Sequence, residues 1–118
     1  MKIVSTVLAA VLAVEFLAFG AAKTLALASM RERAARLGYS IAAYRGIGAL
    51  EIAGASGLLI GPARPPIGIA AGIGLALLMA GAVAAHVRNG DGVAEYAPAA
   101  GTGLVTLGYL AALAGVSP

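Results

Sequence analysis

The sequence predicts an all-α integral membrane protein, a single domain over residues 1–118 built as a bundle of four transmembrane helices. The first observation is composition, because 61% of the residues are hydrophobic and only 11% are charged, against about 25% charged residues in soluble domains. Mean hydropathy is +0.97. The second observation is four apolar stretches, each close to the roughly 20 residues that cross about 30 Å of hydrocarbon. The third is rows of Gly and Ala at helical spacing, which let helices approach closely in lipid.

The four predicted spans cover residues 3–28, 41–61, 66–87 and 97–116. We favour a span over a signal peptide for the first, because Glu15 interrupts the apolar run and the run is too long for a signal sequence. The second span ends at the segment GPARPP, whose prolines cannot continue a helix but suit the start of the next one. The third ends at RNGDG, which combines two turn signals.

The longest connection is ASMRERAARLGYS, and we favour a solvated charged loop there over a short amphipathic helix at the lipid headgroups. Basic residues are divided unequally between the two ends of the predicted bundle: one end has Arg31, Arg33, Arg36 and Arg88, and the other has Lys2 and Arg64. Since Lys and Arg favour the cytoplasmic side, the sequence predicts that both termini lie outside.

Composition excludes several classes of chemistry. The chain contains no cysteine, which excludes disulfides, thiol redox chemistry and cysteine-bound metal or iron–sulfur centres. Eight scattered Lys and Arg, with a net charge of +3, do not form a nucleic-acid-binding stripe. No metal site is predicted, because His86 is the single histidine and no carboxylates share a metal-ligand spacing with it. We favour a hydrogen-bonding role for His86 over haem ligation.

Two carboxylates lie inside predicted spans. Glu15 is about 18 Å and Glu51 about 15 Å into the hydrocarbon, counting 1.5 Å per residue from opposite sides. A charge there costs at least about 2.5–3.5 kcal/mol, so such residues are candidate functional sites. We expect Arg45 to reach towards Glu15 and Lys23 to lean towards Glu51. In the alternative interpretation, these cations neutralise the two acids and only fix helix register.

These residues predict a funnel with a charged mouth, formed by the first and third connections, and with two carboxylates at its bottom. The candidate acid/base residues are Glu15 and Glu51. The candidate ligand-binding residues are Lys23, Arg45, Glu51, His86, Arg88 and Tyr109. For Tyr109 we favour a packed ring over a hydrogen-bond donor to the interior.

Three pieces of sequence carry a family resemblance: FGAAKTL, YRGIGALEIAGASGLLIG and GAVAAHVRNGD. In these pieces and their order the chain resembles the DoxX-like family of small four-span membrane proteins. The resemblance implies a multi-pass protein of the bacterial plasma membrane that binds a lipophilic, quinone-like molecule or serves as an accessory subunit to a redox or detoxification partner protein. Glu15 departs from the family pattern.

Two other functions stay open. One is a membrane enzyme that isomerises a lipophilic substrate or opens its ring, with Glu15 or Glu51 as acid/base and Lys23 or Arg45 stabilising charge. The other is a proton-coupled exporter, since Glu15 and Lys23 are similar to the Glu and Lys of small multidrug resistance transporters. The Gly and Ala rows also suit contact with a second protomer, which makes a homo-oligomer an expectation.

Overall fold

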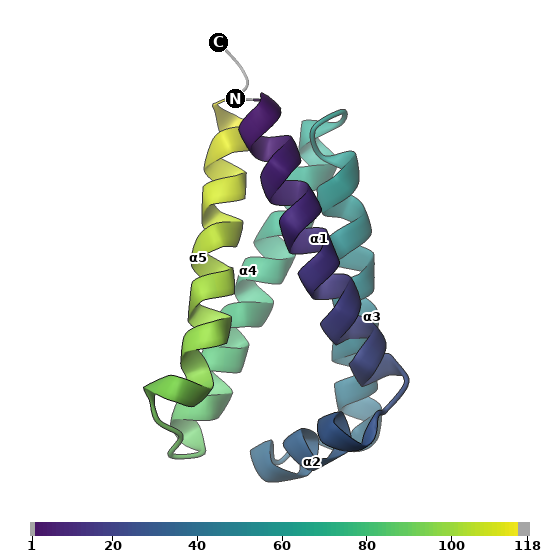
Figure 1. Cartoon of the computed structure of the whole chain (residues 1–118), viewed down its shortest axis with the longest axis vertical. Helices are drawn as coiled ribbons and strands as arrows, with labels where there is room; N and C mark the ends of the chain where they lie inside the picture. Colours follow the sequence, from purple (N-terminus) through teal and green to yellow (C-terminus); the bar gives the residue numbers. More distant parts are fainter. Residues whose placement is uncertain (1, 116–118) are drawn as a thin grey trace.

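The structure, a computed structural model, describes residues 2–115, which form five α-helices and no strand. The helices are α1 (Lys2–Thr24), α2 (Ala28–Leu37), α3 (Ile41–Ile60), α4 (Pro65–Arg88) and α5 (Val93–Ala114). The four long helices alternate in direction, and the short α2 lies at one end of the bundle (Figure 1). The start of α1 and the end of α5 lie together at the other end. The all-α prediction is confirmed.

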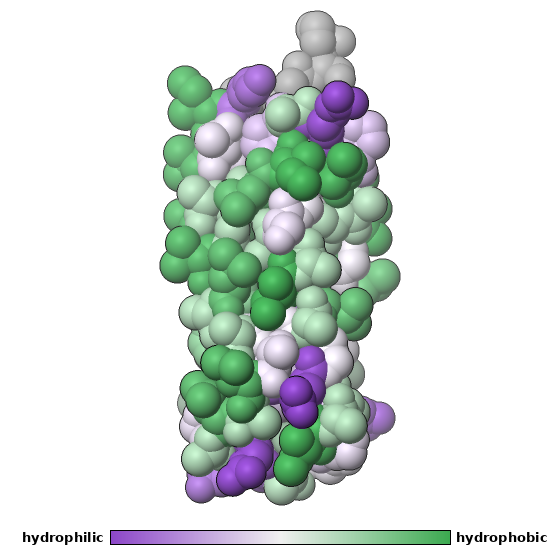
Figure 2. Space-filling model, turned by 90° about the vertical axis from the view of Figure 1, so that its right-hand side faces the viewer, coloured by the Kyte–Doolittle hydropathy of each residue, from purple (hydrophilic) through white to green (hydrophobic). Residues whose placement is uncertain are grey.

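Three of the described helices, α1, α4 and α5, are long and apolar enough to cross a membrane. Their 22 to 24 residues rise by about 33–36 Å, against a hydrocarbon thickness of about 30 Å. The 20-residue α3 carries Arg45 and Glu51 and is not among the three. One face of the molecule is apolar over most of its length, with hydrophilic side chains at both ends (Figure 2). The chain is therefore a membrane protein.

The connection after α1 differs from the expected solvated loop. The first helix ends at Thr24, and Ala26 takes a positive φ of 51°. Residues 28–37 then form the separate helix α2, which buries Met30 and Ala34 against Tyr44 of α3. Burial of this apolar face is what the solvated-loop prediction overlooked. Gly38 caps the end of α2, and its φ of 84° lies in the left-handed region that glycine favours.

The last helix begins at Val93, four residues before the predicted 97–116 span. In a helix that began at residue 97, Pro98 would lie in the first turn, where a missing N–H costs nothing. In the structure the backbone N–H groups of Glu95 and Tyr96 already bond to the carbonyl of Gly92. Pro98 thus lies inside the helix and offers no N–H to the carbonyl of Ala94.

The two helix pairs, α1 with α3 and α4 with α5, meet towards the end that carries the termini (Figure 1). There the backbones of α3 and α4 touch, since a Cβ built on Gly61 would lie 2.8 Å from the Cα of Gly68. The two helix pairs, α1 with α3 and α4 with α5, diverge towards the α2 end (Figure 1). The core fills the part of the bundle where they meet, and consists of Ala9, Leu12, Ala13, Phe16, Ala55, Leu58, Leu75, Met79, Tyr109 and Leu113. The diverging ends leave room for a cavity.

Candidate functional site

A cavity of about 460 Å³ lies between the two diverging helix pairs, at the α2 end of the bundle. We call it the basal cavity. All five helices contribute to its lining. Its apolar walls include Phe16, Phe19, Ile47, Leu77, Leu78 and Met79, and its polar or ionisable side chains are Glu15, Lys23, Arg33, Arg36, Tyr39, Tyr44, Glu51, His86, Glu95 and Thr102. This volume and this mixture are typical of a small-molecule site.

A glycine crossing between α1 and α3 determines what lies on one wall. A Cβ built on Gly48 would lie 2.6 Å from the carbonyl oxygen of Gly20, so the two backbones touch there. Lys23 and Glu51 each follow one of these glycines by three residues, which places them on the same helix faces as the crossing. Because glycine has no side chain at these two positions, the helices approach closely enough for a lysine and a glutamate to meet.

Lys23 and Glu51 form an ion pair, with Nζ donating to Oε1 at 2.6 Å. The Glu51 side chain is only 2% exposed, and that of Lys23 is 11% exposed. The Lys23 ammonium also lies 5.3 Å from the centroid of the Tyr44 ring, a cation–π distance. The expectation that Lys23 leans towards Glu51 agrees with this geometry.

The second carboxylate, Glu15, has a different kind of partner. Thr102 of α5 donates its hydroxyl to Glu15 Oε2 at 2.5 Å, and Glu15 takes part in neither of the two ion pairs formed by residues 2–115. The expected partner, Arg45, is exposed and donates its Nε–H to the carbonyl of Thr24 at 3.0 Å. Arg45 therefore joins the end of α1 to α3 outside the cavity. The predicted contact between Arg45 and Glu15 was therefore wrong.

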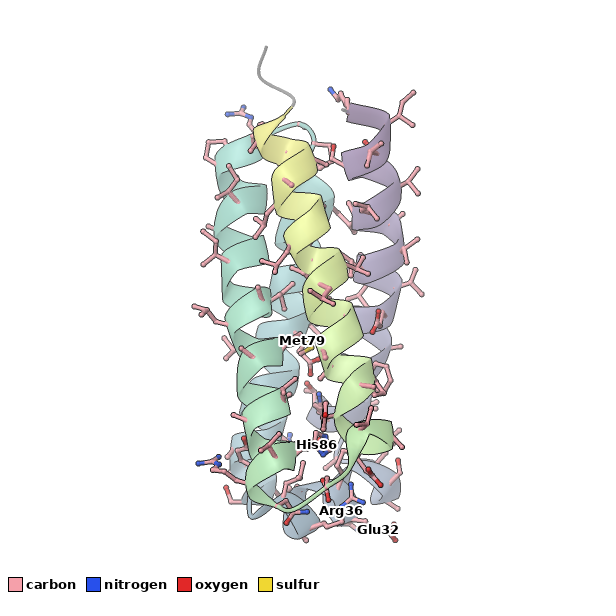
Figure 3. The ribbon with its side chains drawn as sticks, turned by 90° about the vertical axis from the view of Figure 1, so that its left-hand side faces the viewer. Glu32, Arg36, Met79 and His86 are labelled. Carbon is pink, nitrogen blue, oxygen red and sulfur yellow. The ribbon has the colours of Figure 1, made fainter. Side chains whose placement is uncertain are left out.

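The mouth of the basal cavity is polar. His86 donates its Nδ1–H to Asp91 Oδ2 at 2.6 Å, and Asn89 donates to Asp91 Oδ1 at 3.0 Å. The bond from His86, with a smaller contribution from Asn89, holds the pKa of the Asp91 carboxyl below its usual range. Since Nδ1 is engaged, Nε2 is the nitrogen of His86 left for a ligand. In Figure 3 His86 lies between α4 and α5, with Arg36 of α2 beyond it.

The predicted site residues divide into two groups. Glu15, Lys23, Glu51 and His86 line the basal cavity together. Arg45, Arg88 and Tyr109 do not line it: the first two are exposed, and the third is buried in the core. The Tyr109 hydroxyl donates a hydrogen bond to the carbonyl of Leu58, so the favoured interpretation of a ring that only packs was wrong. The four residues that line the cavity lie close together, as expected for the predicted funnel. That they bind a ligand stays a prediction.

Three polar lining residues escaped the sequence reasoning: Thr102, Tyr39 and Tyr44. The two tyrosine rings lie 5.8 Å apart at the start of α3. Aromatic residues next to a basic connection are a usable signal for a binding site, because they combine an apolar ring with a polar tip. Nothing in the local sequence of Thr102 indicates its partner, since Glu15 is 87 residues away.

The basal cavity offers acids, a buried cation and hydroxyls to a ligand. No group of three or more His, Cys, Asp or Glu that could hold a metal ion occurs within the described residues. The side chains that line the cavity can take part in hydrogen bonding, charge stabilisation and proton transfer.

Comparisons with known proteins identify the family. Searches of curated proteins and of solved structures give no match. A model of the DoxX-like family matches residues 7–115, a range that contains every residue of the basal cavity. The chain belongs to the DoxX-like family.

Proposed function

We propose that this protein binds a lipophilic, quinone-like small molecule in the basal cavity. The observation that carries the proposal is the composition of this one cavity, in which apolar walls from α1, α3 and α4 converge on the Lys23–Glu51 ion pair and on Glu15. Apolar walls with a few convergent polar groups are the usual form of a small-molecule site. Family membership supports the same proposal through the quinone-linked proteins that the resemblance implies.

The polar groups suit a ring that carries oxygen atoms. Lys23 uses one N–H on Glu51 and keeps two for a ligand carbonyl. Glu15 accepts from Thr102 through one carboxylate oxygen and keeps the other for a ligand hydroxyl. Phe16 and Phe19 offer faces for ring contact. The cavity is therefore able to receive both the carbonyl oxygens of a quinone and the hydroxyls of its reduced form.

Tyrosine fluorescence provides a direct test, because the chain has four tyrosines and no tryptophan. Tyr39 and Tyr44 line the basal cavity. We expect a tailless quinone such as menadione, added to the purified protein in detergent, to quench tyrosine emission saturably. Matched variants locate the signal: Tyr39→Phe with Tyr44→Phe should remove the saturable part, whereas Tyr96→Phe should keep it. Quenching that rises linearly with quinone, equal in all variants, would contradict the proposal.

A second function is favoured by one observation, the presence of two carboxylates and a lysine in the same cavity. This set suits acid/base opening of a strained ring, with one carboxyl group donating a proton and the other activating water. The test is incubation with a lipophilic epoxide such as 1,2-epoxydecane. Formation of the diol by the wild type, lowered by about 10²–10⁴ in Glu15→Gln or Glu51→Gln, would support an enzyme. Equal conversion with and without protein would exclude this reaction.

We also propose that α3 is the fourth span, in a bacterial plasma membrane and with both termini outside. α3 runs alongside the apolar helices α1 and α4 (Figure 1), and its Glu51 is neutralised by Lys23. Because the chain lacks cysteine, single cysteines report topology. We expect a membrane-impermeant thiol reagent to label Arg64→Cys from outside and Arg31→Cys, on the other side of α3, only after lysis. Labelling of both from one side would contradict four spans.

Association with other proteins stays a prediction. Part of the rows of Gly and Ala at helical spacing is exposed in the structure, namely Ala49, Ala53, Ala80 and Ala84. These positions suit contact with a second protomer or with a redox partner protein. Disulfide trapping at Ala53→Cys and Ala84→Cys in native membranes is the measurement that distinguishes a homo-oligomer from a monomer.

A further inference from the structure

A second hollow lies on the outer face of the bundle between α4 and α5. It has a volume of about 450 Å³, and we call it the α4–α5 groove. All its lining residues are apolar, among them Ile73, Ala76, Ala80, Ala100, Leu104 and Leu107. Its flanks face the surroundings, since Leu77 and Leu104 are both 69% exposed. On two helices that are apolar enough to span a membrane, such a surface faces lipid.

The α4–α5 groove and the basal cavity share a wall. Leu77, Met79 and Ala99 line both. Met79 lies between α4 and α5 (Figure 3), and it is close to Gly103, where a built Cβ would be 3.3 Å from the Met79 Cβ. Methionine is unbranched and adapts to irregular spaces, and Gly103 leaves no side chain opposite it. The partition between the two hollows is thus thin and built around a flexible side chain.

The two hollows differ sharply in chemistry. The basal cavity has ionisable side chains from every helix, whereas the α4–α5 groove has none. Placed end to end, they match a molecule with one polar head and one linear apolar tail. A head alone would leave the groove unused, and a tail confined to the cavity would desolvate charged groups without pairing them.

We propose that the ligand of the basal cavity is a single-headed amphiphile whose long alkyl or isoprenoid tail passes Met79 and lies in the α4–α5 groove. This inference rests on the proposed function, because it needs a head bound in the cavity. It adds the class of ligand and the route between bilayer and site. The tail crosses no water on this route, since the groove opens directly towards lipid.

Paired probes with one head test the inference on the full chain in lipid nanodiscs. The first probe is tailless 2,3-dimethoxy-5-methyl-1,4-benzoquinone, and the second carries a decyl chain at position 6. Ala80→Phe and Ala100→Phe fill the groove from its two helices, and neither residue lines the cavity. Ala84→Phe is the matched control, because Ala84 is also exposed on α4 and lines neither hollow. Comparing each variant with the wild type on the same probe cancels partition into lipid.

We expect the groove variants to weaken binding of the decyl probe at least about tenfold, because a tail without an exit displaces the head from its contacts. Binding of the tailless probe should stay within about twofold of wild type, as should both probes in Ala84→Phe. Equal binding of the decyl probe by wild type and groove variants would overturn the inference and leave the proposed function intact. Failure of both probes to bind wild type would overturn the proposed function, and the inference with it.

A second measurement covers groove variants that fail to fold. A decyl probe with a diazirine at the end of its tail is photolysed on the wild-type protein, and the labelled residues are identified by mass spectrometry. The inference expects labels concentrated on Leu104 and Leu107, competed away by the unlabelled decyl probe. Labels spread over other lipid-facing residues, such as Val11 and Val14 of α1, would overturn it.

Discussion

The hydroxyl of Tyr109 donates a 2.7 Å hydrogen bond to the backbone carbonyl of Leu58. In a regular helix that carbonyl would accept from the N–H four residues later, but position 62 is a proline and has none. Tyr109 on α5 is fully buried, and it therefore satisfies an acceptor that Pro62 leaves unpaired at the end of α3. Gly61 makes room for it, since any Cβ at that position would collide with the hydroxyl.

Tyr109→Phe should destabilise the bundle without affecting ligand binding. The substitution keeps the ring but leaves a buried carbonyl unpaired, which costs about 1–3 kcal/mol. Thermal unfolding in detergent, followed by circular dichroism, measures the loss. Tyr96→Phe is a suitable control, because Tyr96 is only partly buried. Unchanged stability in Tyr109→Phe would show that another group, such as water, already satisfies the Leu58 carbonyl.

Gly48→Ala should separate α1 from α3. Its new methyl group would lie 2.6 Å from the Gly20 carbonyl oxygen, and relieving such overpacking costs about 1–3 kcal/mol. The shift would also pull Lys23 away from Glu51, so quinone quenching of tyrosine fluorescence should weaken as well. Gly46→Ala, two residues away with open space around it, should be neutral or stabilising. Equal melting temperatures for both variants would argue against the glycine crossing.

The Lys23–Glu51 pair should behave as a coupled unit. Lys23→Met leaves a carboxylate that is 2% exposed without its cation, and breaking a buried pair in this way costs about 3–5 kcal/mol. Glu51→Gln should cost less, because Lys23 borders the cavity and Gln still accepts its hydrogen bond. The double variant Lys23→Met/Glu51→Leu should recover stability but not ligand binding. A double-mutant cycle of unfolding free energies, completed with the single variant Glu51→Leu, gives the coupling between the two side chains. Additive effects would show that they do not interact.

The lowered pKa of Asp91, at the mouth of the basal cavity, predicts that the stability of the protein depends on pH. The folded pKa of Asp91 lies below the ordinary value of 3.8, so its contribution to stability is present above that value and is lost as the pH falls through the folded pKa. The melting temperature of wild type should therefore exceed that of Asp91→Asn at pH 6–7. The difference should disappear only in strong acid, below the ordinary Asp range. A difference already lost at pH 5 would contradict this sign.

Glu15→Gln separates the candidate functions. If the ligand is a neutral quinone, the variant should bind it with nearly wild-type affinity, because Gln keeps the acceptor for Thr102 and loses only a charge. A proton-coupled exporter instead needs the carboxylate to bind a lipophilic cation. Binding of tetraphenylphosphonium that weakens in acid and vanishes in Glu15→Gln would favour the exporter. We expect no such binding, since Lys23 is paired with Glu51 rather than placed to assist Glu15.

The sequence alone determined the features that depend on composition and periodicity. Few charges and long apolar runs predicted the all-α membrane fold, and the prolines around position 65 separated two helices. It also predicted that Lys23 leans towards Glu51, because the two residues lie on adjoining antiparallel helices. These are local properties, or follow from pairing two neighbouring helices in the chain.

Only the tertiary structure decided which polar groups share a space. Thr102 meets Glu15 from 87 residues away, and Arg45 binds the end of α1 outside the cavity instead of the acid that the sequence suggested. The burial of Met30 and Ala34 of α2 against Tyr44 is likewise a tertiary contact. The reason is physical: the angle at which two helix pairs diverge depends on side-chain packing along their whole length, and that angle creates the basal cavity and selects its lining.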